Sequence, residues 1–447
     1  MNINEKALEM LQAYPLCDNC LGRQFALLGR GLENSRRGNA LKLNAVLQAS
    51  AYASLKEKQG IKILKLLATS GFSTEAQNAL KHLKKRVPKN DETLTCFLCE
   101  NRFAHIDDMV TKILSKLAEY EFSNFLVGIE LLPRISERED EFKAKFNLSY
   151  SESIKHEFGR IIGKAIESKT AKPVEFLKPD VMIIINPFTE HIKLQINPLF
   201  IAGRYRKLVR DISQSIWICS ACRGKGCKIC NGTGKYYAES VEELVSKPVL
   251  IAAQGVDSFF HASGREDVDA LMLGTGRPFV IEISKPKKRT IDLKEAKNAI
   301  NLAAKNKVEV STLRYSNRNV IRKIKKAENA QKEYRVLIEF EKEITDADMS
   351  LLEQNLNCIT IKQQTPLRVI HRRADLIRER YIYKLKVKKV SPKEAEAQVR
   401  CQGGLYVKEL VSGDEGRTTP SITELLKNPA KTLKLDVLNV IMEDPIR

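Results

Sequence analysis

Eight of the ten cysteines in this 447-residue chain fall in four C-x-x-C pairs, and this pairing strongly constrains how the chain can fold. Two thiolates separated by two residues can hold one tetrahedral ion from a tight turn, and two such turns supply four ligands. A disulfide framework is the alternative, but a reducing cytosol argues against it. The four pairs are Cys17/Cys20, Cys96/Cys99, Cys219/Cys222 and Cys227/Cys230.

The third and fourth pairs are adjacent in the segment CSACRGKGCKICNGTGK, Cys219–Lys235. Glycines after each turn permit the positive φ values that tight turns need. This C-x2-C-x4-C-x2-C arrangement resembles the zinc modules of DnaJ-type chaperones and predicts one structural zinc. The first and second pairs are 75 residues apart, so spacing alone leaves open whether they share an ion. The unpaired Cys358 and Cys401 are expected to be buried small hydrophobic residues.

The charge of the chain points to a polyanionic partner. There are 75 Lys and Arg residues against 55 Asp and Glu, a net charge of +20, so nucleic acid is the first candidate and an anionic membrane the second. No segment approaches the roughly 18 apolar residues that a membrane span needs. The N-terminus carries acidic residues and no apolar signal-like region, so we expect a cytoplasmic protein without a membrane partner.

The length of the chain predicts two or three domains, because one core rarely extends over so many residues. Residues 1–90 show apolar side chains at helical spacing. The segment 105–200 mixes helices with strands, and strands are expected at Asn124–Leu132 and Phe142–Leu148. Beyond residue 248, strands alternate with helices, which predicts a largely antiparallel sheet with helices packed against it. The fold class is therefore α+β.

The segment HASGREDVDALMLGTGRPF, His261–Phe279, concentrates charged residues between glycines. An arginine close to an aspartate favours the ionised carboxylate, and such a carboxylate can act as a nucleophile. A solvated ion pair in a surface turn is the alternative, and the residues alone do not decide between the two.

Two other segments combine cations with residues suited to RNA. Gln195–Ile212 contains Arg204 and Tyr205 in a cluster suited to phosphates and a stacked base, although a solvated helix face gives the same pattern. Gln363–Arg380 crowds arginines near a proline-led loop, and neighbouring arginines after a histidine make a phosphate clamp. The expected clamp residues are Arg368, His371, Arg372 and Arg373.

The motif GREDVD…LGTGRPF resembles the catalytic loop of the THUMP-containing tRNA pseudouridine synthases of archaea and eukaryotes, the Pus-ten family. The resemblance extends in pieces from Cys17 to Arg417, in the family's order. It implies an isomerase that converts uridine to pseudouridine in the T-loop of tRNA, at position 55 and also at 54, with Asp267 as the catalytic residue. The alternative is a non-catalytic zinc- and THUMP-containing tRNA-binding protein. Rossmann glycines and a PP-loop are missing from the sequence, which argues against a THUMP-bearing methyltransferase or thiolase.

The same resemblance implies roles for residues around the target base. Tyr334, in KEYRVLIEF, matches the tyrosine that stacks on the uracil, although the residues alone indicate a core tyrosine. Lys408, in CQGGLYVKELVSGDEGRT, matches the basic residue that pairs with the catalytic carboxylate, with Arg265 nearby, and Val407 matches the apolar residue below the base. Leu405 stands where the pattern has Thr, which puts a local hydrogen bond in doubt. We also expect Tyr406 at the substrate, and Arg277 and Arg417 at the RNA.

The segments LCDNCLGRQFALLG and CFLCENRF match the split zinc site at the start of the family. The resemblance therefore implies that the first two cysteine pairs share one zinc, which gives two structural zincs and no cofactor for catalysis. We expect a monomer that binds tRNA. Its expected parts are a helical region with the split zinc site (1–104), a THUMP-like RNA-binding domain (105–212), a zinc knuckle (213–240) and a pseudouridine synthase catalytic domain (241–447).

Overall fold

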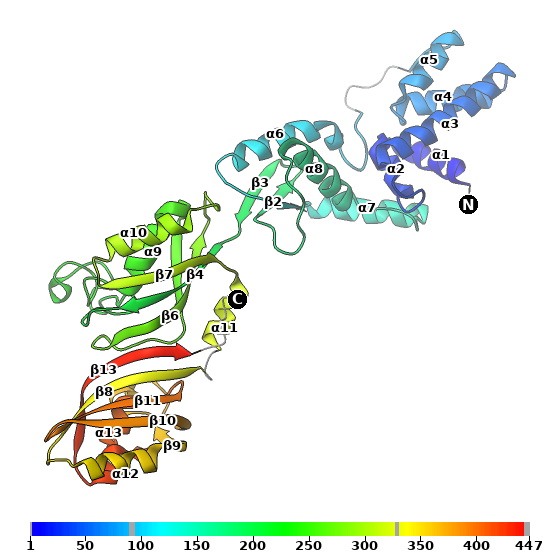
Figure 1. Ribbon diagram of the computed structural model, residues 1–447. Coiled ribbons are helices and arrows are strands. Elements are labelled where there is room, and N and C mark those ends of the chain that lie inside the picture. Colours follow the sequence, from blue (N-terminus) through cyan, green and yellow to red (C-terminus); the bar gives the residue numbers. More distant parts are fainter. Residues whose placement is uncertain (1, 89–93, 327–329, 442–447) are drawn as a thin grey trace. The chain divides into compact units, whose positions relative to one another are not determined.

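The computed structural model describes residues 2–88, 94–326 and 330–441, and Figure 1 shows the course of the chain. The chain divides into two compact units, Met1–Asn197 and Pro198–Arg447. None of the helices in these ranges is both long enough and apolar enough to cross a membrane. Both units mix helices with strands, so the α+β class is confirmed.

The N-terminal unit begins with helices and ends with a small sheet that has the strand order β1-β2-β3. β1 and β2 are parallel, and β2 and β3 form an antiparallel hairpin. Its elements are α1 (Ile3–Ala13), α2 (Asp18–Gly22), η1 (Arg23–Phe25), α3 (Asn34–Ser54), α4 (Lys58–Thr69), α5 (Thr74–His82), η2 (Arg102–His105), α6 (Ile106–Leu117), β1 (Phe125–Ile129), α7 (Pro133–Phe146), α8 (Ile154–Thr170), β2 (Val181–Asn186) and β3 (His191–Ile196).

The expected strand at Phe142–Leu148 is wrong, because most of this segment is the last part of α7. Phe142 and Phe146 are four residues apart and both are buried, which is the spacing of one helix face. Asn147 then ends the helix in the left-handed conformation. A short apolar run of this kind fits the period of a strand and that of a helix, and here the helix forms.

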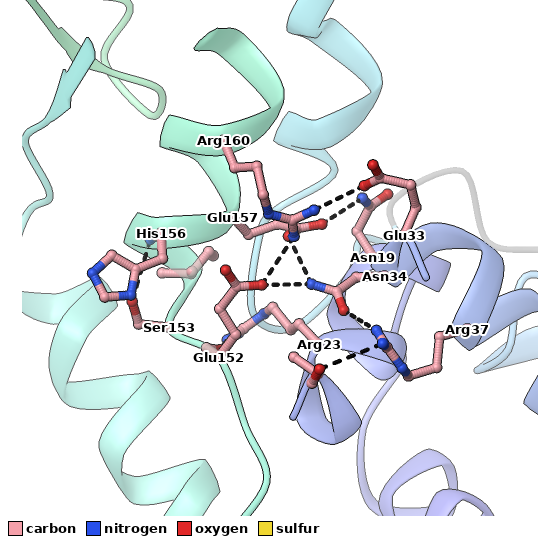
Figure 2. A network of polar contacts seen from close by, with 12 residues as sticks. Asn19, Arg23, Glu33, Asn34, Arg37, Glu152, Ser153, His156, Glu157 and Arg160 are labelled. Carbon is pink, nitrogen blue, oxygen red and sulfur yellow. Dashed lines mark hydrogen bonds and ion pairs between the residues drawn. The ribbon is translucent and has the colours of Figure 1, made fainter. Parts of the chain in front are cut away.

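Buried polar contacts join the helical part of the N-terminal unit to its strand-containing part (Figure 2). The side-chain amide of Asn34, in α3, donates to Glu152 and Glu157 at 2.7 Å each. Arg160 donates to the same two carboxylates. Because Glu157 has no exposed side-chain surface, its charge depends on these donors. Hydrogen bonds to a charged carboxylate therefore hold α3 against α8, in addition to apolar packing.

Arg23 provides a test of this network, because its guanidinium is fully buried and pairs with Glu139. Breaking a buried ion pair by removing one partner costs about 3–5 kcal/mol. We expect Arg23→Ala to lower the free energy of unfolding of the full chain by about that amount in denaturant titrations. The control is Lys164→Ala, which removes an exposed partner of Glu33 and should cost less than about 1 kcal/mol. Equal effects of the two variants would contradict this account.

The C-terminal unit contains a sheet with the strand order β12-β9-β10-β11-β8-β13-β6-β4-β7, and β5 pairs with β6 at the side. Its elements are β4 (Leu199–Lys207), η3 (Lys228–Cys230), α9 (Val241–Ala253), β5 (Asp257–Ala262), β6 (Leu271–Ser284), α10 (Leu293–Ala303), β7 (Val308–Tyr315), α11 (Arg318–Lys325), β8 (Gln331–Phe340), α12 (Asp346–Leu356), β9 (Ile359–Gln364), η5 (Leu367–Arg372), β10 (Ile377–Ser391), β11 (Glu394–Gln402), α13 (Val407–Ser412), β12 (Thr418–Thr419), α14 (Ile422–Leu426) and β13 (Ala430–Ile441).

This sheet is antiparallel apart from one contact, which confirms the expected arrangement. Residues of α9 and α10 pack against β4, β6 and β7 in one core, and those of α12 and α13 pack against β8 to β11 in another (Figure 1). Strand β13 joins the two halves. It runs antiparallel to β8 along its length but pairs in parallel with β6 only at Asp436↔Leu271 and Val437↔Met272.

Two features of this unit differ from the sequence-based expectations. The basic cluster around Arg204 lies on β4, which pairs with β6 and β7, so it is not a helix face. Among the unpaired cysteines, Cys401 is buried as expected, but Cys358 is exposed. Cys358 closely follows the end of α12, in the left-handed conformation of a turn, so its position is set by the chain reversal and not by a core.

Candidate active site and metal centres

A cavity of about 610 Å³ lies in the C-terminal unit, and the loop between β5 and β6 brings Asp267 to its wall. Leu435 and Val437 of β13 also line it, which places the cavity beside the narrow join between the two halves of the sheet. The structure collects the expected substrate residues here from distant parts of the chain. They are Arg265, Tyr334, Tyr406, Val407 and Lys408, together with Arg368 and Arg373 of the expected clamp.

The carboxylate of Asp267 lies between two cations. Lys408 Nζ is 3.3 Å from its Oδ2, and Arg368 Nη1 is 3.6 Å from the same oxygen. The guanidinium of Arg368 is itself held by Glu409 of α13, through Nε at 2.5 Å. The Asp267 side chain is 41% exposed, so a molecule in the cavity can reach it. Opposite charges at these distances fix the direction of the carboxylate.

Asp269 shares Lys408 with Asp267, and its carboxylate lies 2.9 Å from the Lys408 ammonium. Desolvation of Asp269 opposes its ionisation, but the hydrogen bond and charge of Lys408, together with the charge of Arg210 and a backbone hydrogen bond, outweigh this effect, so the pKa of Asp269 lies below its usual value. Lys408 is therefore held between two carboxylates, and the Arg-Glu-Asp-Val-Asp segment presents Asp267 and Asp269 to the same cation.

Behind Asp267, the side chain of Glu266 points into the protein. It accepts hydrogen bonds from Arg277 Nε at 2.8 Å and from the Tyr205 hydroxyl at 3.0 Å. Gln214 donates to the Tyr205 hydroxyl at 2.7 Å and to the carbonyl of Gly264 at 2.9 Å. Neighbouring side chains of the loop thus face opposite ways, so Glu266 anchors the loop while Asp267 reaches the cavity.

A buried lysine completes this anchor. The ammonium of Lys207 donates to the backbone carbonyls of Ile212, Asp267 and Val268, at 3.0, 3.1 and 3.0 Å. An ammonium has three donors, and all three are used here. Burial lowers the pKa of Lys207, with nearby carboxylates acting in the opposite direction. Sequence reasoning missed Glu266, Lys207 and Gln214, because a charged residue in a motif does not reveal whether its side chain points inward.

Tyr205 and Arg277 were expected at the RNA, but both side chains are inside the protein, at 0% and 1% exposure. Burial raises the pKa of the Tyr205 hydroxyl well above its usual value. Arg277 also donates to the carbonyl of Ser263 at 2.7 Å. In this structure the two side chains offer no surface to RNA, and their contacts hold the loop that carries Asp267.

The remaining expected RNA residues lie around the cavity or at the surface. Arg204 donates to the carbonyl of Gly276 at 2.9 Å. Arg373 donates to the Tyr406 hydroxyl at 2.8 Å, and His371 is exposed in η5. Arg417 grips the carbonyl of Thr365 through two nitrogens, which gives it a structural contact. The side chain of Arg372 lies outside the part of the structure that is described.

Tyr334 lies in β8, between the two cores of the C-terminal unit, and packs against both. Burial raises the pKa of its hydroxyl. Lys332, two residues earlier on the same face of the strand, also lines the cavity. Val407 begins α13 and is buried, and the backbone of Tyr406 exchanges hydrogen bonds with the side chain of Gln363. Leu405 is buried in the core beside β8.

The cysteines gather into two groups of four, as the resemblance implied. The sulfurs of Cys17, Cys20, Cys96 and Cys99 all lie within 4.8 Å of one another, and so do those of Cys219, Cys222, Cys227 and Cys230. Cys17 and Cys99 have their sulfurs 3.6 Å apart, and Cys219 and Cys227 have theirs 3.9 Å apart. Four sulfurs bound tetrahedrally at about 2.3 Å lie about 3.8 Å apart. Both groups can therefore hold a metal ion.

Comparison with known proteins identifies the family. The model described as "Pus10, C-terminal" matches residues 200–441, and "Pus10 THUMP domain, archaeal" matches residues 109–186. A protein named tRNA pseudouridine synthase Pus10 from Methanocaldococcus jannaschii is 44% identical, over 97% of this chain and 93% of its own. This chain belongs to the Pus10 family.

A second member, tRNA pseudouridine synthase Pus10 of Methanothrix thermoacetophila, is 38% identical over 97% of this chain and 93% of its own. One solved structure with a weaker similarity, a crystal structure of a Cbf5-Nop10-Gar1 complex, has 15% identity and a TM-score of 0.29, over 46% of each chain. The match to the Pus10 C-terminal model, residues 200–441, includes every residue that lines the cavity.

The partly buried Lys332, which lines this Pus10 cavity, gives a pH-dependent prediction. Burial, with repulsion from Arg277, lowers the pKa of Lys332 to about 8 from its ordinary 10.5. Between about pH 8 and 10.5 the unfolded chain binds more protons than the folded one, so stability rises with pH in this window. We therefore expect the free energy of unfolding of the natural chain to rise relative to that of Lys332→Met across this range, in urea titrations. The difference should be constant below about pH 8.

The exposed Lys362 on β9 is the matched control. The natural chain and Lys362→Met should keep a constant difference in stability over the same pH range. A Lys332→Met difference that is equally flat would contradict the burial argument.

Proposed function

We propose that this chain is a tRNA pseudouridine synthase that isomerises uridine to pseudouridine in the T-loop of tRNA, at position 55 and also at 54. Relatives that match nearly its whole length carry the name tRNA pseudouridine synthase Pus10. The observation that carries the assignment of residues is the position of Asp267, held by Lys408 and Arg368 on the wall of a cavity that Tyr334 also lines.

In this proposal the target uridine is extruded from its stack into the cavity, which costs a few kcal/mol. Tyr334 offers an aromatic surface that replaces part of the lost stacking, and Val407 lies below the base. Asp267 then attacks the sugar or the base as a nucleophile. The N1–C1′ bond breaks, the uracil rotates and C5 bonds to C1′. C5 loses a proton, N1 gains one, and the carboxylate is released unchanged.

Lys408 and Arg368 keep the Asp267 carboxylate in place through this sequence. Arg265 was expected beside it, but its guanidinium stacks on Trp217, and Arg368 takes that position. Because an isomerisation neither adds a group nor changes the oxidation state, we propose that catalysis needs no cofactor.

The charge distribution supports tRNA as the partner of the C-terminal unit. This unit holds 46 of the 75 Lys and Arg residues and 31 of the 55 Asp and Glu, a net charge of +15. Most of the affinity should come from phosphates. We assign phosphate contacts to Arg204, His371, Arg372 and Arg373, and we assign Tyr205, Arg277 and Arg417 to holding the protein side of the interface.

We further propose that each cysteine group holds one structural zinc ion. Four sulfurs complete a tetrahedral shell and leave no position for substrate, so the ions would support folding and RNA docking. Reduced thiolates of this kind suit the cytoplasm, where we place the protein as a monomer.

The assignment of Asp267 is tested by Asp267→Asn, which keeps the shape of the side chain but removes the nucleophile. We expect pseudouridine formation on unmodified tRNA transcript to fall by roughly 10³-fold or more, with tRNA affinity within several-fold of the natural chain. Carbodiimide–reverse-transcription mapping gives the product and its position.

Asp269→Asn is the matched control, because Asp269 contacts the same Lys408 and should have a mild effect. Near-normal turnover by Asp267→Asn would reject the assignment. If the natural chain bound tRNA but formed no pseudouridine, a non-catalytic tRNA-binding role would be favoured instead.

The metal proposal is tested by plasma emission spectrometry of the purified chain, which should give about two zinc ions. Serine at Cys219 and Cys222 should remove one ion, and serine at Cys17 and Cys20 the other. A single zinc in the natural chain would show that the distant N-terminal pairs do not share an ion.

A further inference from the structure

Trp217 is the one tryptophan of the chain, and its indole lines the same cavity as Asp267. The guanidinium of Arg265 lies over its ring, 5.2 Å from the centroid. Tyr237 supports the ring from another direction, edge-on, at a centroid distance of 5.5 Å. Trp217 is partly exposed and Arg265 is exposed, so the stacked pair is open to solvent.

The cysteine group of the knuckle segment, residues 213–240, determines where Trp217 lies. The carbonyl of Trp217 accepts from the backbone N–H of Tyr236 at 2.9 Å. Ile218 pairs with Lys235 in an antiparallel bridge, and Cys219 N–H donates to the carbonyl of Gly234 at 2.8 Å. These hydrogen bonds therefore join the chain segment that enters the four-cysteine group to the segment that leaves it. Trp217 is one of the residues that they join.

The surface of the knuckle segment is suited to RNA. Residues 213–240 contain four Lys or Arg residues and a single acidic residue, Glu239. Ile218, Ile229 and Tyr236 are exposed among them. Cations beside exposed apolar and aromatic groups are the combination that single-stranded RNA binds, through its backbone and its bases.

We propose that Trp217 and Arg265 form a stacking platform for a nucleotide next to the target uridine, and that the knuckle segment sets the position of this platform. The inference rests on the function proposed above. Tyr334 is partly buried and packs against two cores where it lines the cavity, whereas Arg265 is exposed. A uridine that reaches Asp267 therefore leaves its neighbour in the chain near the solvent side, where the platform lies. Extrusion breaks the stacking of that neighbour, and aromatic or guanidinium planes can replace it.

The single tryptophan makes a direct binding test possible, because all indole emission comes from Trp217. The inactive Asp267→Asn variant is titrated with unmodified tRNA transcript, and binding is followed independently by the anisotropy of labelled tRNA. We expect tRNA to quench the indole emission, and the degree of quenching should follow the binding curve obtained from anisotropy. Unchanged emission at saturating tRNA would overturn the proposal.

Kinetics give the second test. Loss of one base–aromatic stack corresponds to about a 5- to 150-fold effect, so Trp217→Leu should lower kcat/KM by a factor in this range. Trp217→Phe, which keeps a ring, should retain more of the activity. The control is Leu302→Ala, which changes an exposed side chain of α10 that does not line the cavity, and it should leave kcat/KM unchanged. A Trp217→Leu value within twofold of the natural chain would overturn the proposal.

Zinc content and melting temperature are measured for each variant. If Trp217→Leu loses metal, the emission titration, which uses the intact knuckle, decides the question. The proposed function fails separately, when the natural chain forms no pseudouridine, and the emission titration still reports whether RNA contacts Trp217.

Discussion

The buried ion pair between Arg277 and Glu266 is the contact on which the candidate site depends. Two charges removed from water are costly unless each is well paired, and here Tyr205 adds a further donor to the Glu266 carboxylate. The ammonium of Lys207 donates hydrogen bonds to two backbone carbonyls of the same loop. These contacts use the low dielectric of the interior to hold a glycine-bounded loop rigid. Asp267 is therefore presented to the cavity in one direction, which is the preorganisation that the proposed catalytic role would need.

The second constraint is the narrow join between the two halves of the C-terminal sheet. Asp436, in β13, accepts from Arg210 beside β4 at 2.5 Å and from Arg335 in β8 at 3.1 Å. One carboxylate thus ties both halves together at the point where β13 and β6 share only two residue pairs. Since the strands diverge from this point, side chains of both halves can surround a cavity. The short pairing between β13 and β6 therefore makes room for the cavity.

Sequence reasoning found the residues whose chemistry is local and missed those whose role depends on direction. The cysteine pairs and the mixed α+β class follow from spacing and periodicity. The grouping of Asp267 with Tyr334 and Lys408 comes from the family resemblance. The sequence does not show whether the side chains of Tyr205 and Arg277 point into the protein or toward solvent. Only the register of β4 and β6 shows that they are buried. Phe142 and Phe146 belong to a short apolar run that is compatible with a strand, and their spacing of four residues is equally compatible with one face of a helix. Trp217 offered no signal, because its neighbours are distant in sequence.

The position of β13 has a consequence for how the molecule is made. This strand, Ala430–Ile441, lies between β8 and β6, although more than 140 residues separate β6 from it in the sequence. On a translating ribosome the half containing β4 to β7 and the half containing β8 to β11 emerge without the strand that joins them. Their facing edges stay unpaired until β13 has been synthesised, which is a period of exposure to wrong pairing. Folding chaperones at the exit tunnel would meet two half-sheets, and the cavity, which Leu435 and Val437 help to line, would be complete only once β13 is in place.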